Sequence, residues 1–335
     1  MRATAFESQV RQALFASRRI HPAEIVLWLA AFAAFLLFPR HMLLLNEIAT
    51  LALFALSLDL ILGYAGIVSL GHAAFLGMGA YAAGLLAKHV TADPFAGLGI
   101  GMAAAGLLGL FTSPLVLRGS DLTRLMVTLG VALILYELAN SFGSLTGGAD
   151  GLQGIMMAPV LGLFEFDIFG RTAYLYSLSV LFLLFLIARR VTNSPFGLSL
   201  RAIRDNPLRA SASGVPNGRR LAAMYTLAAA YAGAAGALLA QTTQFVSLDV
   251  LDFHRSADLM LVLITGGAGY LYGGLIGAIA FKLLQDAIST LTPQYWMFWI
   301  GLFLVLFVLG GRELIHGGVK AVAGRFARFG KGAAR

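Results

Sequence analysis

Long apolar runs separated by short polar segments recur along this chain of 335 residues. Several runs approach the roughly 20 apolar residues that an α-helix needs to cross the hydrocarbon layer of a membrane. Charged residues make up 12% of the chain, about half the share of an ordinary soluble domain. Hydrophobic residues make up 59%. The sequence therefore predicts an all-α polytopic membrane protein.

Ten runs are candidates for transmembrane or partly spanning helices. They cover residues 22–38, 43–62, 73–87, 94–116, 123–142, 172–188, 221–245, 257–266, 273–290 and 295–309. The runs 73–87 and 257–266 are too short to cross comfortably alone. Because ten is an even number, we expect both termini on the same side of the membrane.

The positive charges indicate which side that is. Of the 24 Lys and Arg residues, 19 lie in the segments 1–21, 118–124, 189–220 and 312–335. Loops rich in Lys and Arg stay on the cytoplasmic side. We therefore expect cytoplasmic basic ends at 1–21 and 312–335, a transmembrane domain over 22–311 and a large outer loop over 143–170. The first apolar run is interpreted as a retained span and not as a removed signal peptide.

The segment 189–220 is an arginine-rich loop between two apolar runs. Its seven basic residues are Arg189, Arg190, Arg201, Arg204, Arg209, Arg219 and Arg220. Lipid cannot solvate these guanidinium groups, so the loop must lie in water. A cytoplasmic loop of this size indicates a docking partner. The formal net charge of +8 does not predict nucleic-acid binding, because the basic residues mark topology.

Within this loop we expect a short helix over 199–209 on the inner membrane face. Leu200, Ile203 and Leu208 would form its apolar side. Prolines and glycines punctuate its ends: Pro195, Gly197, Pro207 and Gly214. An ordinary basic loop that touches lipid headgroups is the alternative.

Two glycine-rich stretches, 63–81 and 266–277, interrupt the apolar pattern. Each follows an apolar run and opens another. Non-helical backbone at membrane depth persists only where protein or a water-filled cavity satisfies its polar groups. Paired broken segments in the two halves of a transporter therefore point to a translocation path. Close helix packing is the alternative, because several glycines have small-xxx-small spacing. Both interpretations remain open.

Motifs for catalysis are absent from the sequence. It contains no G-x-x-x-x-G-K-[ST], no H-E-x-x-H and no G-x-S-x-G, and it has no cysteine. We therefore expect no enzyme activity, no metal site and no ATPase of its own. Six acids lie in or near the runs: Glu24, Glu47, Asp59, Glu137, Asp258 and Asp286. Glu24 is expected at the membrane interface, and Asp258 is a candidate helix cap for 257–266.

Four blocks of the sequence resemble the LivM-type permease subunits of branched-chain amino-acid ABC importers. The blocks are 57–81, 145–155, 196–215 and 254–278, and they occur in the order of that family. The most specific are FGLSLRAIRDNPLRASASGV in the arginine-rich loop and ITGGAGYLYGGLIGA in the second glycine stretch. Two dipeptides depart from the family pattern: Ala257-Asp258 stands in place of Gly-Glu, and Gly273-Gly274 in place of Gly-Pro.

The resemblance implies a permease in the bacterial inner membrane, with several partners. They are a second permease subunit (LivH-like, or another copy of this chain), two cytoplasmic ABC ATPases and a periplasmic substrate-binding protein. ATP and Mg would bind to the ATPases, and this chain would hold no cofactor. The implied substrate is a branched-chain or related amino acid. The alternatives are urea or short amides, or an ion-coupled secondary transporter that uses the intramembrane carboxylates directly.

The same resemblance, together with the loop and glycine patterns, suggests two sets of site residues. The expected ATPase-coupling residues are Arg201, Ala202, Ile203, Arg204, Asp205, Asn206 and Arg209. The candidates for the translocation path are Gly66, Ser69, Gly71, His72, Phe75, Met78, Tyr81, Gly269 and Tyr270. His72 is alternatively a structural hydrogen-bond partner, and the aromatic residues are alternatively packing residues.

Overall fold

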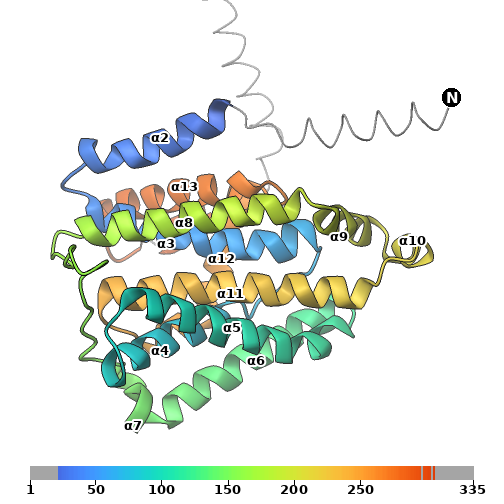
Figure 1. The fold of residues 1–335 in the computed structure, drawn as a ribbon, viewed down its shortest axis with the longest axis horizontal. Coiled ribbons are helices and arrows are strands. Elements are labelled where there is room, and N and C mark those ends of the chain that lie inside the picture. Colours follow the sequence, from blue (N-terminus) through green and yellow to red (C-terminus); the bar gives the residue numbers. More distant parts are fainter. Residues whose placement is uncertain (1–21, 296, 303–304, 306–335) are drawn as a thin grey trace, which may run out of the picture. The chain divides into compact units, whose positions relative to one another are not determined.

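The computed structural model describes residues 22–295, 297–302 and 305 and is helical in these parts (Figure 1). Apart from two isolated β-bridges, the described residues contain no strand pairing. The predicted all-α class is therefore confirmed there. The chain divides into two compact units, Met1–Ile279 and Ala280–Arg335.

The long helices of the first unit follow the predicted apolar runs. They are α2 (Pro22–Leu37), α3 (Met42–Asp59), α4 (Ala73–His89), α5 (Pro94–Leu117), α6 (Asp121–Ser141), α8 (Arg171–Thr192), α11 (Asn217–Thr243) and α12 (Phe253–Gly266). A π-helical turn, η1 (Leu60–Tyr64), continues α3. The predicted outer loop holds α7 (Gly143–Thr146) and η2 (Gly148–Asp150), and η3 (Leu248–Leu251) precedes α12.

The second unit begins within α13 (Leu271–Leu291), and its other described part includes a helical segment at 297–302. The predicted basic ends 1–21 and 312–335 lie outside the described residues, and the predicted span 295–309 is described only in part, at 295, 297–302 and 305.

Six of the described helices are long and apolar enough to cross a membrane. They are Met42–Tyr64, Pro94–Leu117, Asp121–Ser141, Arg171–Thr192, Asn217–Thr243 and Leu271–Leu291. The helices α4 and α12 are shorter, with 17 and 14 residues, as the runs 73–87 and 257–266 predict. The chain is therefore a multi-pass membrane protein.

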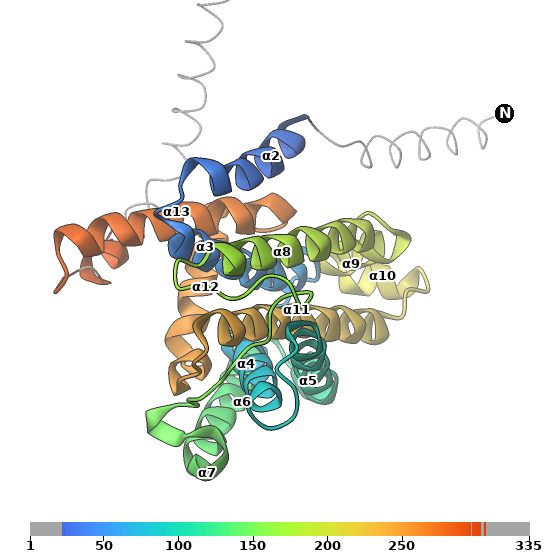
Figure 2. The same ribbon diagram turned by 60° about the vertical axis from the view of Figure 1, so that its left-hand side comes forward.

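The helix α11 forms the centre of the first unit. In two views it lies between α3 and α8 on one side and α4 and α5 on the other (Figures 1 and 2). Glycines allow these helices to approach closely. A Cβ atom at Gly79 would lie 2.2 Å from the Gly233 carbonyl oxygen, and one at Gly101 would lie 2.8 Å from Ala237 Cβ. Helix packing therefore explains these glycines.

Polar pairs join α2 and α3 to α8. Ser177 Oγ donates to Asn46 Oδ1 at 2.7 Å inside the bundle. Arg189 Nη1, in the last turn of α8, lies 2.6 Å from Glu24 Oε2 in the first turn of α2. Glu24 thus lies near a helix end, as predicted. The pair fixes the start of α2 beside the end of α8 from which the arginine-rich loop departs.

Candidate functional site

The arginine-rich loop folds into two short helices, α9 (Pro195–Asp205) and α10 (Pro207–Ala212). The single helix predicted over 199–209 is therefore wrong. The break falls at Asn206, whose backbone is extended with φ −158° and ψ 100°. Pro207 causes the break, because its ring disfavours the helical conformation of the preceding residue and it has no N–H.

Polar side chains fix the start of both short helices. The Ser194 hydroxyl accepts a hydrogen bond from the Gly197 N–H at 3.4 Å. The Asn206 side chain accepts one from the Arg209 N–H at 2.9 Å. A proline follows each cap, at the helical position where a missing N–H does no harm. Asn206, which we expected to couple to an ATPase, is thus first of all a helix cap.

The helix α9 has an inner face and an exposed face. Leu200 and Ile203 are buried, as predicted for the apolar side. Leu208, predicted to join them, is 83% exposed, because the break at Asn206 places it in a separate helix. The predicted coupling residues that are exposed are Ala202, Arg204, Asp205, Asn206 and Arg209. The Arg204 side chain is 40% exposed.

Two arginines of α9 contact the region where the first glycine stretch begins. The Arg201 guanidinium lies over the Tyr64 ring, 5.0 Å from its centre. Arg204 Nη1 donates to the backbone carbonyl of Gly63. Gly66 has a φ of +71°, and a Cβ atom there would lie 2.7 Å from Arg204 Cγ. The inner side of α9 is therefore attached directly to the first broken segment.

The two glycine stretches meet at Asp59, the last residue of α3. Its side chain is fully buried, and Oδ1 accepts a hydrogen bond from the Gly269 N–H at 2.6 Å. A Cβ atom at Gly63 would lie 2.2 Å from Asp59 Oδ1 and 2.5 Å from Gly269 N, so a larger residue would separate the stretches. Asp59, Gly63, Arg204 and Gly269 are called the junction below.

The second broken segment is the short turn 267–270 between α12 and α13. Gly267 and Gly269 have φ values of +94° and +87°, which L-residues with side chains rarely adopt. Next to the turn, a Cβ atom at Gly266 would lie 1.8 Å from the Gly273 carbonyl oxygen. The glycines of this stretch thus serve both interpretations left open by the sequence: some break the helix, and others allow close packing.

The first broken segment, 65–72, is longer and mostly buried. Side chains from distant helices satisfy its backbone. The Leu70 N–H donates to Thr128 Oγ1 at 3.3 Å, and the Ala73 N–H, at the start of α4, donates to Ser256 Oγ at 2.9 Å. Backbone at this depth is thus stabilised by protein groups, as the membrane environment requires.

His72 is fully buried, and its Nε2 lies 2.8 Å from Ser57 Oγ. The Ser57 hydroxyl donates its proton to the Phe54 carbonyl oxygen at 2.5 Å. Its oxygen therefore accepts from His72 Nε2, which assigns the ring proton to Nε2. Nδ1 is a buried acceptor without a hydrogen-bond partner among the described residues. His72 is therefore a structural hydrogen-bond partner in this fold, which is one of the two roles considered for it from the sequence.

The other predicted path residues occupy different environments. Buried residues are Ser69, Gly71, Phe75 and Tyr81; Met78 is half-buried, and Tyr270 is 75% exposed. Phe75 packs edge-on against the rings of His72 and Tyr225. The Ser69 hydroxyl has no hydrogen-bond partner within the described residues. A role of these side chains in translocation stays a prediction.

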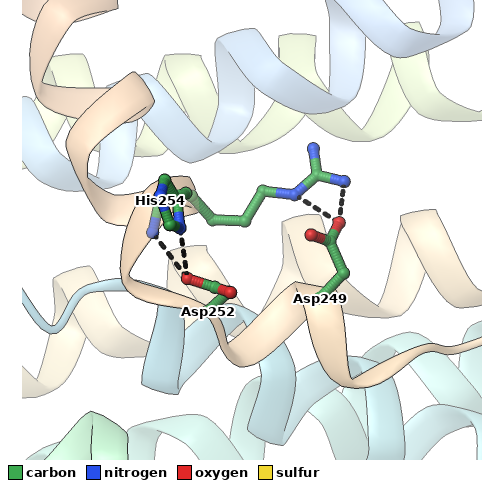
Figure 3. A network of polar contacts seen from close by, with 4 residues as sticks. Asp249, Asp252 and His254 are labelled. Carbon is green, nitrogen blue, oxygen red and sulfur yellow. Dashed lines mark hydrogen bonds and ion pairs between the residues drawn. The ribbon is translucent and has the colours of Figure 1, made fainter. Parts of the chain in front are cut away.

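A separate polar group surrounds the first turn of α12 (Figure 3). Asp252 caps the helix and accepts hydrogen bonds from the His254 N–H at 2.9 Å and the His254 ring at 2.8 Å. Arg255 Nε donates to Asp249 Oδ2 at 2.9 Å. The helix thus begins before 257, and the predicted cap Asp258 is wrong because Asp252 has that role. The hydrogen bonds that His254 donates, first from its backbone N–H and then from its ring, lower the pKa of Asp252. The hydrogen bond to Asp252 in turn raises the pKa of His254.

Sequence reasoning missed the contacts that Ser57, Asp59, Thr128 and Ser256 make with the broken segments. Asp59 alone gave a signal, as a carboxylate one helical turn before a glycine in an apolar run. The described residues contain no group of three or more His, Asp or Glu side chains that could hold a metal ion. The site is thus a junction of backbone groups and charged side chains.

The sequence of this chain has identifiable relatives. It is 28% identical over 293 residues to the high-affinity branched-chain amino acid transport system permease protein LivM of Escherichia coli (strain K12), which covers 78% of this chain and 68% of that protein. It is 25% identical over 251 residues to the probable branched-chain amino acid transport permease protein LivH of Methanocaldococcus jannaschii, which covers 71% of this chain and 77% of that protein. No solved structure matches it.

A family model agrees with these relatives. The model described as branched-chain amino acid transport system / permease component matches residues 40–308. That range includes both broken segments and both short helices of the arginine-rich loop. The chain therefore belongs to the family of branched-chain amino acid transport system permease components.

Proposed function

We propose that this chain is the permease subunit of an ABC importer for branched-chain or related amino acids. One observation carries the proposal beyond family membership. Through Arg201 and Arg204, the inner side of α9 contacts η1, the turn directly before the first broken segment. Asp59, at the end of α3 where η1 begins, accepts a hydrogen bond from the second broken segment. A movement imposed on α9 from outside the membrane would therefore reach the backbone breaks inside it.

We place the arginine-rich loop and both termini in the cytoplasm of a bacterial inner-membrane protein. The distribution of Lys and Arg supports this orientation. The Arg189–Glu24 pair supports one part of this placement, because it fixes the start of α2 on the same side as the end of α8 that leads into the loop. In this topology the chain has about ten crossing or partly crossing helices, with α4 and α12 as the partly crossing ones.

The exposed side of α9 and α10 is the proposed ATPase contact. Leu208 offers an exposed apolar side chain there, and the polar groups around it are Asp205 and Arg209. This division gives the loop two functions. The exposed side binds the ATPase, and the inner side transmits its movement to the membrane helices.

Energy and substrate would come from other subunits. The sequence contains no phosphate-binding loop, so ATP and Mg would bind to two cytoplasmic ATPases. A periplasmic binding protein would deliver the substrate, and a LivH-like subunit or a second copy of this chain would complete the membrane part. The path would run beside the first broken segment, near Gly66, Ser69 and His72. Urea and short amides remain the alternative substrates.

Reconstitution separates this proposal from an ion-coupled carrier. The tagged chain, purified from its native membrane, should bring ATPase subunits with it. In proteoliposomes the complex should take up labelled leucine when ATP and the binding protein are supplied. Uptake by the purified chain alone under an ion gradient would contradict the proposal. Uptake of urea in place of leucine would change the proposed substrate but leave the proposed mechanism unchanged.

A charge reversal tests the docking face. Arg209→Glu places an acid on the exposed side of α10, and we expect the substrate-stimulated ATP hydrolysis of the complex to fall about tenfold, or about 1.4 kcal/mol of coupling. Arg190→Glu is the matched control, because it makes the same charge change at an exposed position of α8. Equal effects of both variants would show a general charge requirement and reject a specific docking face.

A further inference from the structure

Asp59 stands out among the acids of the membrane helices because it is fully buried but poorly satisfied. Its Oδ1 accepts one hydrogen bond, from the Gly269 N–H. Its Oδ2 is buried and has no hydrogen-bond partner among the described residues. A buried carboxylate with one neutral donor is costly, and an asparagine could accept the same bond without a charge. The presence of a carboxyl group at this position, where an amide would make the same bond, therefore needs a functional explanation.

Arg204 is the cationic residue of the junction. It donates to the Gly63 carbonyl, and Gly63 lies directly against both Asp59 and Gly269. The Arg204 Nη1 atom also lies 3.4 Å from the position that a Cβ atom at Gly269 would take. Between Asp59 and Arg204, both fully described, no ion pair forms, and the carboxylate within reach of Arg204 is Asp205 at 3.5 Å.

We propose that Asp59 is the positioning residue that makes the second broken segment follow the movement of α9. Arg204 holds η1, directly before the first segment, through Gly63, and Asp59 holds the second segment through Gly269. An ionised Asp59 would attract the Arg204 guanidinium across these two glycines. Asp59 is fully buried, and water around the 40% exposed Arg204 side chain screens part of this attraction. This inference rests on the proposed role of α9 in ATPase coupling and extends it to a segment that α9 reaches through the junction.

The connection has a defined order. A displacement of α9 acts on Arg204, then on Gly63 in η1, then through Asp59 on Gly269. Beyond Gly269, the close contact between Gly266 and Gly273 makes the adjoining ends of α12 and α13 a tight hairpin. The hairpin would therefore move as a piece when its turn is pulled.

Asp59→Asn separates the charge from the hydrogen bond, because the amide oxygen can still accept from Gly269. In the assembled complex we expect basal ATP hydrolysis to be retained and substrate uptake per ATP to fall about tenfold. Glu137→Gln is the control, because Glu137 is exposed on α6 and contacts Ser141 of its own helix. Unchanged uptake per ATP in Asp59→Asn would overturn the proposal.

A distance measurement tests the proposal even if Asp59→Asn does not assemble. The natural chain has no cysteine, so spin labels can be attached to Leu198→Cys on α9, Ala268→Cys in the turn and Leu107→Cys on α5. On addition of a non-hydrolysable ATP analogue, the 198–268 distance should stay constant while both distances to 107 change. A 198–268 distance that changes by as much as the others would refute the link.

These results also separate the inference from the proposed function. If the wild-type complex lacks ATPase subunits or binding-protein-stimulated hydrolysis, the proposed function fails. If the wild-type complex is coupled and Asp59→Asn is coupled equally well, the inference alone fails. Loss of assembly in Asp59→Asn together with independent movement of the labels would leave Asp59 a purely structural role.

Discussion

The two broken segments of this protein are stabilised in opposite ways. The first, 65–72, is mostly buried, and side chains of α3, α6 and α12 bond to it or to its edges. The second, 267–270, is a partly exposed glycine turn whose described side-chain bond comes from Asp59. A backbone fixed from several helices cannot move alone, whereas one held at a single point can. The comparison identifies the first segment as a scaffold that moves only together with the helices that hold it, and the second as a turn that can be displaced relative to its surroundings.

Adding one methyl group to each segment gives the largest expected contrast. A Cβ atom at Gly71 would lie 1.8 Å from the Thr128 carbonyl oxygen, and the backbone on both sides is held in place. We expect Gly71→Ala to lower the free energy of unfolding by about 3 kcal/mol. Gly267→Ala meets no atom within 4 Å, so only its positive φ opposes the change, at about 1 kcal/mol.

Thermal unfolding in detergent measures this contrast. Gly71→Ala should show the much larger fall in midpoint temperature, and Gly267→Ala should remain folded and assemble. Equal shifts for the two variants would break the comparison, because the second segment would then be as tightly constrained as the first.

Removing one hydroxyl beside each segment gives a smaller contrast. Ser57→Ala leaves the donor of His72 Nε2 unpaired in the core, which we expect to cost about 2 kcal/mol. Thr265, beside the second segment, bonds within its own helix to the Val262 carbonyl at 2.9 Å. Thr265→Ala should therefore change the free energy of unfolding by less than about 0.5 kcal/mol. Chemical unfolding in detergent measures both, and a larger effect of Thr265→Ala would reverse the assignment of scaffold.

The smallest expected effect concerns pH at the far end of α12, the helix that leads into the second segment. The folded-state pKa of Asp252 is lowered, chiefly by the His254 N–H bond, so its contribution to stability is lost as pH falls through that lowered value. The pKa of His254 is raised, first by its hydrogen bond to Asp252 and then by that residue's charge. The histidine contribution is present below about pH 6.5 and is lost as pH rises through the raised value.

The pair is therefore strongest between about pH 4 and pH 6.5. A proton NMR titration of the His254 ring in the intact protein measures its pKa directly. Asp252→Asn should return that pKa toward the ordinary histidine value, and Arg255→Gln should leave it raised. If the pKa of His254 stays raised in Asp252→Asn, the Asp252 carboxylate does not bond to the His254 ring as the structure describes.

The positions of the long helices could be predicted from the sequence, because run length and apolar content are local properties, and six of these helices are long and apolar enough to cross a membrane. The broken segments were also predictable, since glycine clusters at 63–81 and 266–277 interrupt apolar runs. The helix at 199–209 was misplaced because apolar spacing was given more weight than Pro207. That residue breaks the helix at Asn206 and leaves Leu208 exposed.

The junction could not be predicted from local patterns. Asp59 and Gly269 are 210 residues apart, and Arg204 reaches Gly63 across 141 residues. Contacts at such separations depend on how α3, α9 and α12 pack, and no periodicity encodes that packing. The bond between Ser57 and His72 is shorter in sequence, at 15 residues, but it crosses a non-helical segment whose course the sequence does not reveal.

The π-helical turn η1 determines which way the end of α3 faces. A π-turn contains one residue more than the α-helical turn it replaces, so it rotates every side chain beyond it by about 100° relative to a regular helix. Deleting one residue within Leu60–Tyr64 would keep the apolar composition of the span. It would nevertheless swing the Tyr64 ring away from Arg201. The register of this single helical turn thus determines how the arginine-rich loop contacts the membrane helices.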